Sequence, residues 1–225
     1  DLLRGTKLEL PVLVAAFYGL RRSEALGLKW DAIDFERNTI TIKHIVTNAK
    51  IDGKCEIVCA DRAKTKSSLR SLPLVSNIRE KLLALREQQK ENRRVCGNCY
   101  SKKYDGYVFV DAMGNIFNPR SVTANFSKLL EQNGLRPIRF HDLRHTFATM
   151  AISSGVDVKT LSSMLGHYSA GFTLDTYTHI TNDMQRGAAE KIGGFMESVT
   201  AANTPEPPDP PEESRCKVIP FEKVG

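Results

Sequence analysis

Two histidines, an arginine and a tyrosine could together bind and attack a phosphate group. His141 and Arg144 are close to one helical turn apart, so on a helix they point into a shared space. His167 follows Gly166, which is placed to end a short helix in the left-handed conformation. Tyr177 comes ten residues later. Delivered by three successive short helices, these side chains indicate a phosphate-handling site with a phenolic nucleophile.

Helical periodicity predicts which faces of these helices are buried. From His141 onward, a step of 100° per residue places His141, Arg144 and Ala148 on one side. The opposite side is apolar, and we expect it to be the buried one: Leu143, Phe147, Met150 and Ala151. Asp157 is placed to cap the next helix, VKTLSSMLG.

The segment from Leu8 to Leu28 is apolar at helical spacing and predicts two helices joined near Gly19. Arg21 and Glu24 follow this break. In isolation an arginine here is more typical of a surface charge paired with the glutamate.

Residues 34–74 change to short alternating runs, TITIKHIV, CEIVC and SLRSLPL, which predict a small antiparallel sheet. One of its turns carries Lys64 and Lys66. It is either a solvated loop or a hairpin that lays a lysine over a ligand.

Helical patterns dominate the rest of the chain. They cover residues 77–94, 118–134 and 182–197, the second opening with an Asn118 cap and Pro119. Five prolines between 201 and 211 exclude that segment from a core. The sequence therefore predicts a mainly α fold with one small antiparallel β-sheet (α+β).

Composition sets outer bounds on partners and location. The chain carries +6, and because residues 198–225 hold five acids and three bases, residues 1–197 carry +8. This charge is compatible with a polyanionic partner. The absence of a long apolar run or leader favours a cytoplasmic protein with no membrane partner.

Five cysteines raise the question of a metal. Cys55 with Cys59 and Cys96 with Cys99 could form a zinc knuckle, or they are free thiols in two loops; Cys216 is the odd one.

Five motifs occur in an order that resembles the tyrosine recombinase (phage-type integrase) family: GLRRSEALGLKW, KTKSS before SLRSLPL, HDLRHTFAT, LGH and LDTYTH. The resemblance extends from roughly Leu8 to Phe195. Similarity is closest to integrases of conjugative transposons and temperate phages, and Xer resolvases share the pattern. The resemblance implies the tyrosine recombinase catalytic-domain fold and these catalytic residues: Arg21, Lys64, His141, Arg144, His167 and the nucleophile Tyr177. Lys66 is the alternative to Lys64, and Glu24 would orient the arginine or a neighbour.

Chemistry supports these roles. Attack on a phosphodiester needs cations at the non-bridging oxygens, where charge builds up, and forked guanidinium groups suit that geometry. The resemblance implies a site-specific DNA recombinase that acts through a 3′-phosphotyrosine and a four-way junction, to excise and integrate a mobile element. It needs neither ATP nor a divalent metal. Alternatives are an Xer-type resolvase, a type IB topoisomerase, and a DNA-binding module with a vestigial site.

The resemblance also implies an assembly. We expect double-stranded DNA as partner and a homo-oligomer, a tetramer, that exchanges the helix at 182–197. An accessory excisionase or DNA-bending protein is also expected, and the protein would act at the bacterial nucleoid. Residues 1–197 would form the catalytic domain, and 198–225 an acidic, proline-rich linker and tail. No N-terminal DNA-binding domain is visible, so the chain is expected to be a fragment.

Overall fold

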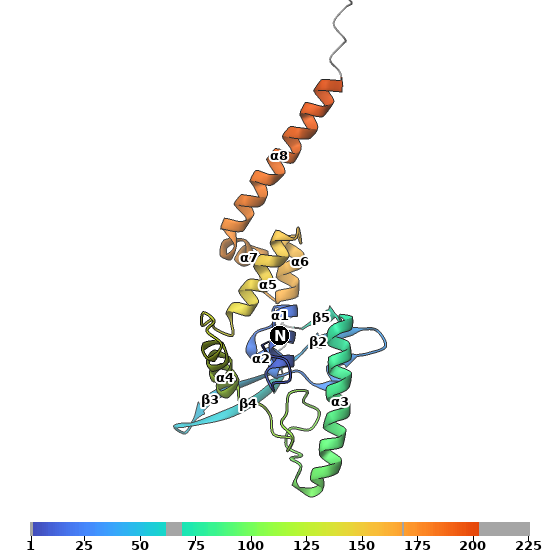
Figure 1. Ribbon diagram of the computed structural model, residues 1–225, viewed down its shortest axis with the longest axis vertical. Coiled ribbons are helices and arrows are strands. Elements are labelled where there is room, and N and C mark those ends of the chain that lie inside the picture. The colour runs from blue at the N-terminus through green and yellow to red at the C-terminus, as the bar shows by residue number, and fades with distance from the viewer. Residues whose placement is uncertain (1, 62–68, 168, 203–225) are drawn as a thin grey trace, which may run out of the picture. The chain divides into compact units, whose positions relative to one another are not determined.

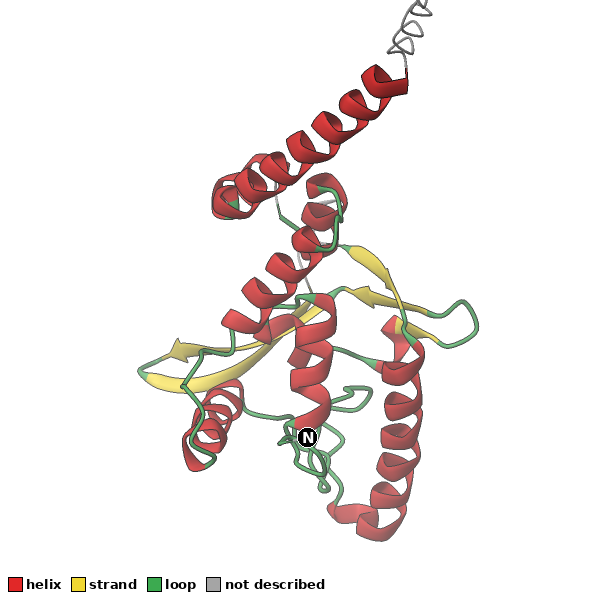
Figure 2. Cartoon of the chain, turned by 45° about the horizontal axis from the view of Figure 1, so that its top comes forward, coloured by secondary structure: helices red, strands yellow, loops and turns green. Residues whose placement is uncertain are grey.

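The computed structural model describes residues 2–61, 69–167 and 169–202. It divides into two units, of which the first ends at Asp183 and the second begins at Met184. Helices and two small antiparallel sheets build the first unit (Figure 1, Figure 2). The expected mainly α fold with small antiparallel β-structure is confirmed. Among the described helices, none has the combined length and apolar character that a membrane crossing requires.

Two helices open the first unit, as the sequence predicts. Helix α1 (Glu9–Tyr18) ends at Gly19, which has a φ of +60° and so turns the chain in the left-handed conformation. Helix α2 (Arg22–Leu26) follows after a short break. Pro11 lies in the first turn of α1, where its missing N–H costs no hydrogen bond.

The β-structure forms two separate sheets. A 3-10 turn, η1 (Trp30–Ala32), leads into β1 (Ile33–Asp34), and β2 (Thr39–Ile42) lies between β1 and β5 (Arg70–Pro73). Strands β3 (His44–Ile51) and β4 (Lys54–Asp61) pair only with each other among the described strands.

The expectation of one sheet was therefore wrong, since the described strands form two: SLRSLPL pairs with β2, and CEIVC pairs with β3. Helix α2 gives the physical reason. A Cβ on Gly27 would lie 2.5 Å from the carbonyl oxygen of His44, so β3 packs directly against the end of α2. The backbone leaves the first sheet at Lys43 to make this contact.

Helix α3 (Ser76–Cys96) and helix α4 (Pro119–Gln132) flank an irregular stretch that begins with the 3-10 turn η2 (Gly97–Cys99). The amide of Arg120 donates to the side chain of Asn118, which caps α4 as predicted. The YVFV run at residues 107–110 bends between two isolated β-bridges, Tyr107 with Lys29 and Val110 with Ile116, and all four of its side chains are buried.

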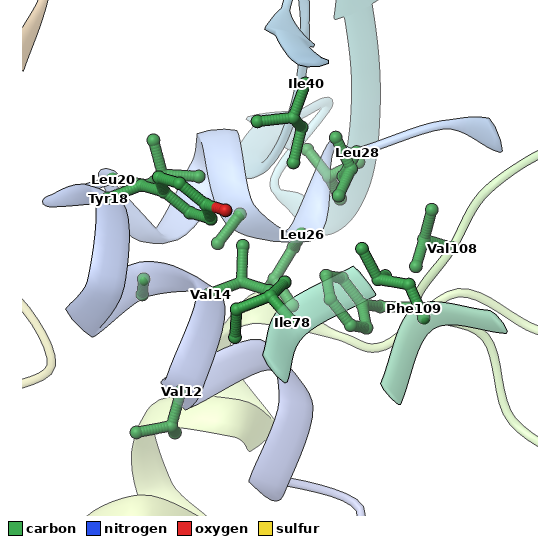
Figure 3. Close-up of a cluster of buried hydrophobic side chains, with 14 of the residues drawn as sticks. Val12, Val14, Tyr18, Leu20, Leu26, Leu28, Ile40, Ile78, Val108 and Phe109 are labelled. Atoms are coloured by element: carbon green, nitrogen blue, oxygen red, sulfur yellow. The ribbon is translucent and has the colours of Figure 1, made fainter. Parts of the chain in front are cut away.

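A continuous apolar core holds these elements together. Side chains from α1, α2, β2, α3 and the YVFV run interdigitate, as Figure 3 shows for Val14, Leu26, Ile40, Ile78 and Phe109. Burial on this scale is the main stabilising contribution to a domain of this size. It holds in place the start of α2, where Arg21 lies, and the start of β5, where Arg70 lies.

The C-terminal helices of the first unit have a smaller core of their own. Helix α5 (Asp142–Ser153) is followed by α6 (Val158–Leu165) and α7 (Ala170–Thr176), and α8 (Thr178–Ala202) continues into the second unit. Buried side chains of the smaller core come from α5, α6 and the residue after α7: Ala148, Ile152, Leu161, Leu165 and Tyr177.

Candidate active site

Arg21 lies at the start of α2 and is held by Glu24. Its Nη1 donates to Glu24 Oε1 over 2.8 Å, and its backbone N–H donates to Glu24 Oε2 over 3.1 Å. The glutamate side chain is fully buried, whereas that of Arg21 is 36% exposed. Arg22 points elsewhere, because its Nη1 donates to Thr123 Oγ1 on α4. Arg21 is thus the arginine of this pair that is fixed at the site and still accessible.

Arg70, at the start of β5, is a site residue to which the sequence analysis assigned no role. Its Nη2 donates to Glu24 Oε2 over 2.7 Å, and its Nε donates to the Met164 carbonyl over 2.6 Å. The arginine is buried. Glu24 therefore joins two arginines, and Arg70 ties the sheet to the last turn of α6. The sequence signal was an arginine inside an alternating strand, where an apolar residue is usual.

Arg144 is buried and ties three elements together. Its Nη1 donates to the Gly19 carbonyl over 2.8 Å, and its Nη2 donates to the Leu165 carbonyl over 2.9 Å. Burial, with Arg21 nearby, lowers the pKa of Arg144 to about 9, while Glu24 acts in the opposite direction. The guanidinium remains cationic at neutral pH.

The predicted burial of α5 was wrong in part. Leu143, Phe147 and Ala151 pack against the cores as expected, but Met150 is 64% exposed. The fully buried positions of the helix include Arg144 and Ala148, which were expected on the opposite side. The reason is that two backbone carbonyls satisfy the arginine inside the protein, so the residue counted as polar packs inward.

His167 follows helix α6 at its left-handed stop. Asp157 caps the start of this helix by accepting from the Thr160 amide, and Gly166 ends it with a φ of +64°, both as predicted. His167 Nδ1 lies 2.7 Å from Thr173 Oγ1 on α7. Burial, together with the charges of Arg144, Arg21 and Arg70, lowers the pKa of His167 to about 4. The imidazole is therefore neutral at physiological pH.

Tyr177 is the residue after α7 and is only 4% exposed. Its hydroxyl lies 3.0 Å from His145 Nδ1 on α5. Burial raises the pKa of Tyr177, and the charge of Arg144 opposes that rise. His145 stands in the HDLRHTFAT motif, but the sequence analysis gave it no role because its partner is 32 residues further along.

His141 lies at the mouth of the same group. It is exposed at the first turn of α5, and its ring centroid is 4.9 Å from that of His145. Partial desolvation and the charges of His145, Arg144 and Arg21 lower the pKa of His141. At neutral pH it can accept or donate a proton in its neutral form.

Two other expectations concern residues away from this group. Lys64 and its alternative Lys66 lie outside the described residues. Cys55 and Cys59 on β4 are free and exposed, and Cys96 and Cys99 are also free thiols. Within the described ranges, no group of three or more His, Cys, Asp or Glu side chains is arranged to hold a metal ion.

The arrangement brings together five of the six expected catalytic side chains and adds two others. Arg21, Arg144 and Arg70 place positive charge around the neutral His167. Their charges contribute to the lowered pKa of this histidine. A phenol is buried against the same arginine, Arg144. Chemically, such an arrangement can hold an anion beside a phenol oxygen that is able to act as a nucleophile.

Comparison with known proteins decides the family. The model of the phage integrase family matches residues 5–184, about four fifths of the chain. The chain belongs to the phage integrase family. The match begins just before α1 and ends at the start of the second unit, and it confirms the resemblance to tyrosine recombinases.

Relatives and solved structures agree with this membership. A tyrosine recombinase XerC-like protein of Caldanaerobacter subterraneus subsp. tengcongensis is 32% identical over 201 residues, which cover 87% of this chain and 51% of the relative. The ICEBs1 integrase of Bacillus subtilis (strain 168) is 31% identical over 81% of this chain and 48% of its own. The chain spans about half the length of these curated relatives.

The fold has a solved counterpart. The Tn1549 transposon integrase, in a complex with transposon right end DNA, matches with a TM-score of 0.66 and 22% identity, over 81% of this chain and 57% of that one. At this identity the likeness is evidence of the fold, and it agrees with the tyrosine recombinase catalytic-domain fold expected above.

Proposed function

We propose that this chain is the catalytic part of a site-specific DNA recombinase, which cleaves and rejoins DNA to excise and integrate a mobile element. One observation carries the proposal: the buried hydroxyl of Tyr177 lies in a group that also contains Arg144, Arg21 and two histidines. The relatives named above, a tyrosine recombinase and an integrase, support it.

In the proposed reaction Tyr177 attacks the scissile phosphorus. The Tyr177 Oη–P bond forms and the P–O5′ bond breaks, which leaves a 3′-phosphotyrosine and a free 5′-hydroxyl. Rejoining is the reverse reaction with a 5′-hydroxyl from the partner strand, and the exchange of strands passes through a four-way junction.

Arg144 and Arg21 would hold the phosphate. Arg144 uses two of its five N–H bonds on protein carbonyls, which fixes the fork and leaves the others for non-bridging oxygens. Glu24 positions Arg21. His141 and His167 donate to the developing charge as neutral imidazoles. Lys64, or Lys66 in its place, protonates the departing 5′-oxygen.

No external energy source is needed in this proposal. The phosphotyrosine conserves the energy of the phosphodiester, so the joining step requires neither ATP nor a divalent metal. The family's chemistry is compatible with arginines as the phosphate-binding cations.

DNA contacts outside the site would come from α4 and the turn after it. Arg120, Lys128 and Arg136 are exposed there, and Lys128 and Arg136 have no acidic partner among the described residues. By contrast, Lys81, Lys90, Arg93 and Arg94 of α3 each pair with an acid. Unpaired cations release more counterions on binding phosphates.

We also propose an assembly on DNA, at the nucleoid. Residues 1–197 act as the catalytic domain, and α8 packs onto a neighbouring subunit of a tetramer. In support, α8 exposes three large apolar side chains: Ile192, Phe195 and Met196. An excisionase or a DNA-bending protein would set the direction of the reaction, and residues 198–225 serve as a linker and tail.

The test is covalent capture. A duplex with a nick beside the crossover, made from the ends of the DNA element that carries the coding sequence, is incubated with the chain without metal or nucleotide. We expect an adduct on a denaturing gel that Tyr177→Phe abolishes while the native gel shift persists. An adduct that survives Tyr177→Phe would contradict the assignment of the nucleophile.

The same reaction separates the remaining functions. Strand transfer between two labelled duplexes identifies a recombinase, whereas relaxation of a supercoiled plasmid without transfer identifies a type IB topoisomerase. A shift on the native gel with no adduct, in a longer protein that includes the upstream residues, would leave a DNA-binding module with a vestigial site.

A further inference from the structure

The hydroxyl of Tyr177 is the proposed nucleophile. Among the described residues, His145 is the titratable side chain that forms a hydrogen bond with it. The Nδ1 atom of His145 lies 3.0 Å from the Tyr177 hydroxyl, and the ring centroids are 6.1 Å apart. This is the distance of a hydrogen bond between a nucleophile and a base. His145 is in the second turn of α5 and Tyr177 follows α7, so tertiary packing brings them together.

The neighbours of this pair favour a particular direction of the hydrogen bond. Arg144, on the same helix, acts on Tyr177 with a positive charge and supports loss of its proton. Burial opposes the phenolate, because an isolated charge is poorly solvated there. A phenol in this position therefore ionises most readily when its proton moves to an adjacent base.

The other two histidines are engaged elsewhere. His167 Nδ1 lies 2.7 Å from Thr173 Oγ1, and its low pKa makes it a weak base. His141 contacts the ring of His145 and is exposed. Within the described residues, the titratable groups that face His145 are His141 and Asp142 on its own helix and Tyr177 from α7.

We propose that His145 is a catalytic residue that removes the proton from Tyr177 during DNA cleavage and returns it during rejoining. This role rests on the proposed function. In cleavage, the Tyr177 O–H bond breaks, its proton moves to His145 Nδ1, and the electron pair on Oη forms the bond to phosphorus. The 5′-oxygen leaves with the electron pair of the P–O5′ bond and takes a proton from the lysine described above.

Rejoining restores the starting state. The incoming 5′-hydroxyl gives its proton back to the lysine and forms its bond to phosphorus. The Tyr177 Oη–P bond breaks, its electron pair stays on Oη, and the imidazolium of His145 returns the proton to Oη. The ring of His141 lies edge-on against that of His145 and limits its movement during the reaction.

One arm of the test uses the chain alone. Nitrogen-15 labelling of histidine reports which ring nitrogen carries the proton. We expect Nδ1 of His145 to accept the hydrogen bond from the Tyr177 hydroxyl, with the ring proton on Nε2. Tyr177→Phe should shift the Nδ1 signal toward that of a nitrogen without a hydrogen-bond donor. A proton on Nδ1 of His145 would overturn the proposal.

A second arm measures adduct formation with the nicked duplex in a single turnover. His145→Asn keeps a polar atom near the position of Nδ1 but takes up no proton, so we expect cleavage to slow by about 100-fold or more. In His145→Ala, added imidazole should restore part of the rate. Thr146→Ala is the matched control on the same turn, because Thr146 is exposed and donates only to the Asp142 carbonyl.

The outcomes separate this proposal from the function on which it rests. Cleavage by His145→Asn within about threefold of the wild-type rate would overturn the base role and leave the recombinase intact. Slow cleavage that imidazole does not rescue, with an unchanged pH profile, would make His145 structural and also overturn it. Loss of the adduct in the wild-type chain would overturn the proposed function itself. Gel shifts and circular dichroism verify that each variant binds DNA and folds.

Discussion

Arg70 and Glu24 form an ion pair almost removed from water, since their side chains are 6% and 0% exposed. Removal of Arg70 takes away one of the cations that compensate the buried Glu24 carboxylate, which costs more than the loss of a surface pair. We expect Arg70→Met to reduce the free energy of unfolding by roughly 3 to 5 kcal/mol, as measured by urea denaturation.

The control for this variant is Arg37→Met. Arg37 pairs with Asp34 at 3.9 Å, but its side chain is 86% exposed. Such a pair contributes little in water, so stability should hardly change. Equal losses in the two variants would refute the role of Arg70 as a buried tie between Glu24 and α6.

The pKa of His167 predicts a dependence of stability on pH. Its folded-state pKa is about 4, below the value of about 6.5 for the unfolded chain, so the unfolded state binds more protons between these values. Stability should therefore fall as the pH drops from 6.5 toward 4. In His167→Gln this fall should be smaller by roughly 2 kcal/mol, allowing for partial solvent screening. Urea melts at pH 7.5 and pH 4.5 measure the difference, and parallel curves would contradict the assigned shift.

The sequence identified candidate site residues where they stand in a motif at the spacing that a shared site requires. Arg21, Arg144, His167 and Tyr177 converge, although they lie far apart in the sequence. His145 could not be assigned, because its role depends on a contact that only tertiary packing creates. Arg70 was missed for the same reason, since its partners lie 46 and 94 residues away.

Helices α1, α5 and α6 meet at Gly19. A Cβ added there would lie 2.5 Å from Phe147 Cδ1 and 2.6 Å from Leu165 Cδ2. Gly19→Ala therefore combines left-handed strain with overpacking. We expect it to destabilise the chain by about 1 to 3 kcal/mol more than Gly53→Ala does.

Gly53 provides the comparison for this prediction. It also has a positive φ, +77°, yet nothing lies within 4 Å of an added Cβ. In Gly53→Ala, the loss of stability should come from conformational strain alone. Thermal melts of both variants give the difference, and equal melting temperatures would show that the helix junction adapts to the methyl group.

Local signals located the helices well. Asn118, Asp157 and Gly166 act as the caps and stop that their types predict. The burial of Arg144 on α5 was not predicted, because hydrophobic periodicity treats arginine as solvent-facing and two distant carbonyls reverse that preference. The division into two sheets was not predicted, because the close contact between Gly27 and β3 is not a local property.

For the molecule as a whole, charge placement predicts how DNA binding responds to salt. Lys128 and Arg136 are exposed and without acidic partners among the described side chains. Lys128→Gln with Arg136→Gln should weaken binding to an arbitrary duplex and reduce the slope of log affinity against log salt by about 2. Fluorescence anisotropy between 50 and 200 mM salt measures it.

The matched pair for this test lies on α3. Lys90→Gln with Arg94→Gln removes the same charge, but both side chains are already paired with Glu87 and Glu91. We expect a smaller effect on the slope. A larger effect than at α4 would place the DNA on the other face of the molecule.

The ties made by Arg144 have a consequence for how the chain is synthesised. They join residue 144 to Gly19 and Leu165, and the proposed nucleophile follows at 177. At about 5 to 20 residues per second, roughly 8 to 31 seconds separate the synthesis of Arg21 from that of Tyr177. During that interval the nascent chain already carries Arg21 but lacks the proposed nucleophile. In the proposed function, translation itself therefore delays DNA cleavage until Tyr177 has been added.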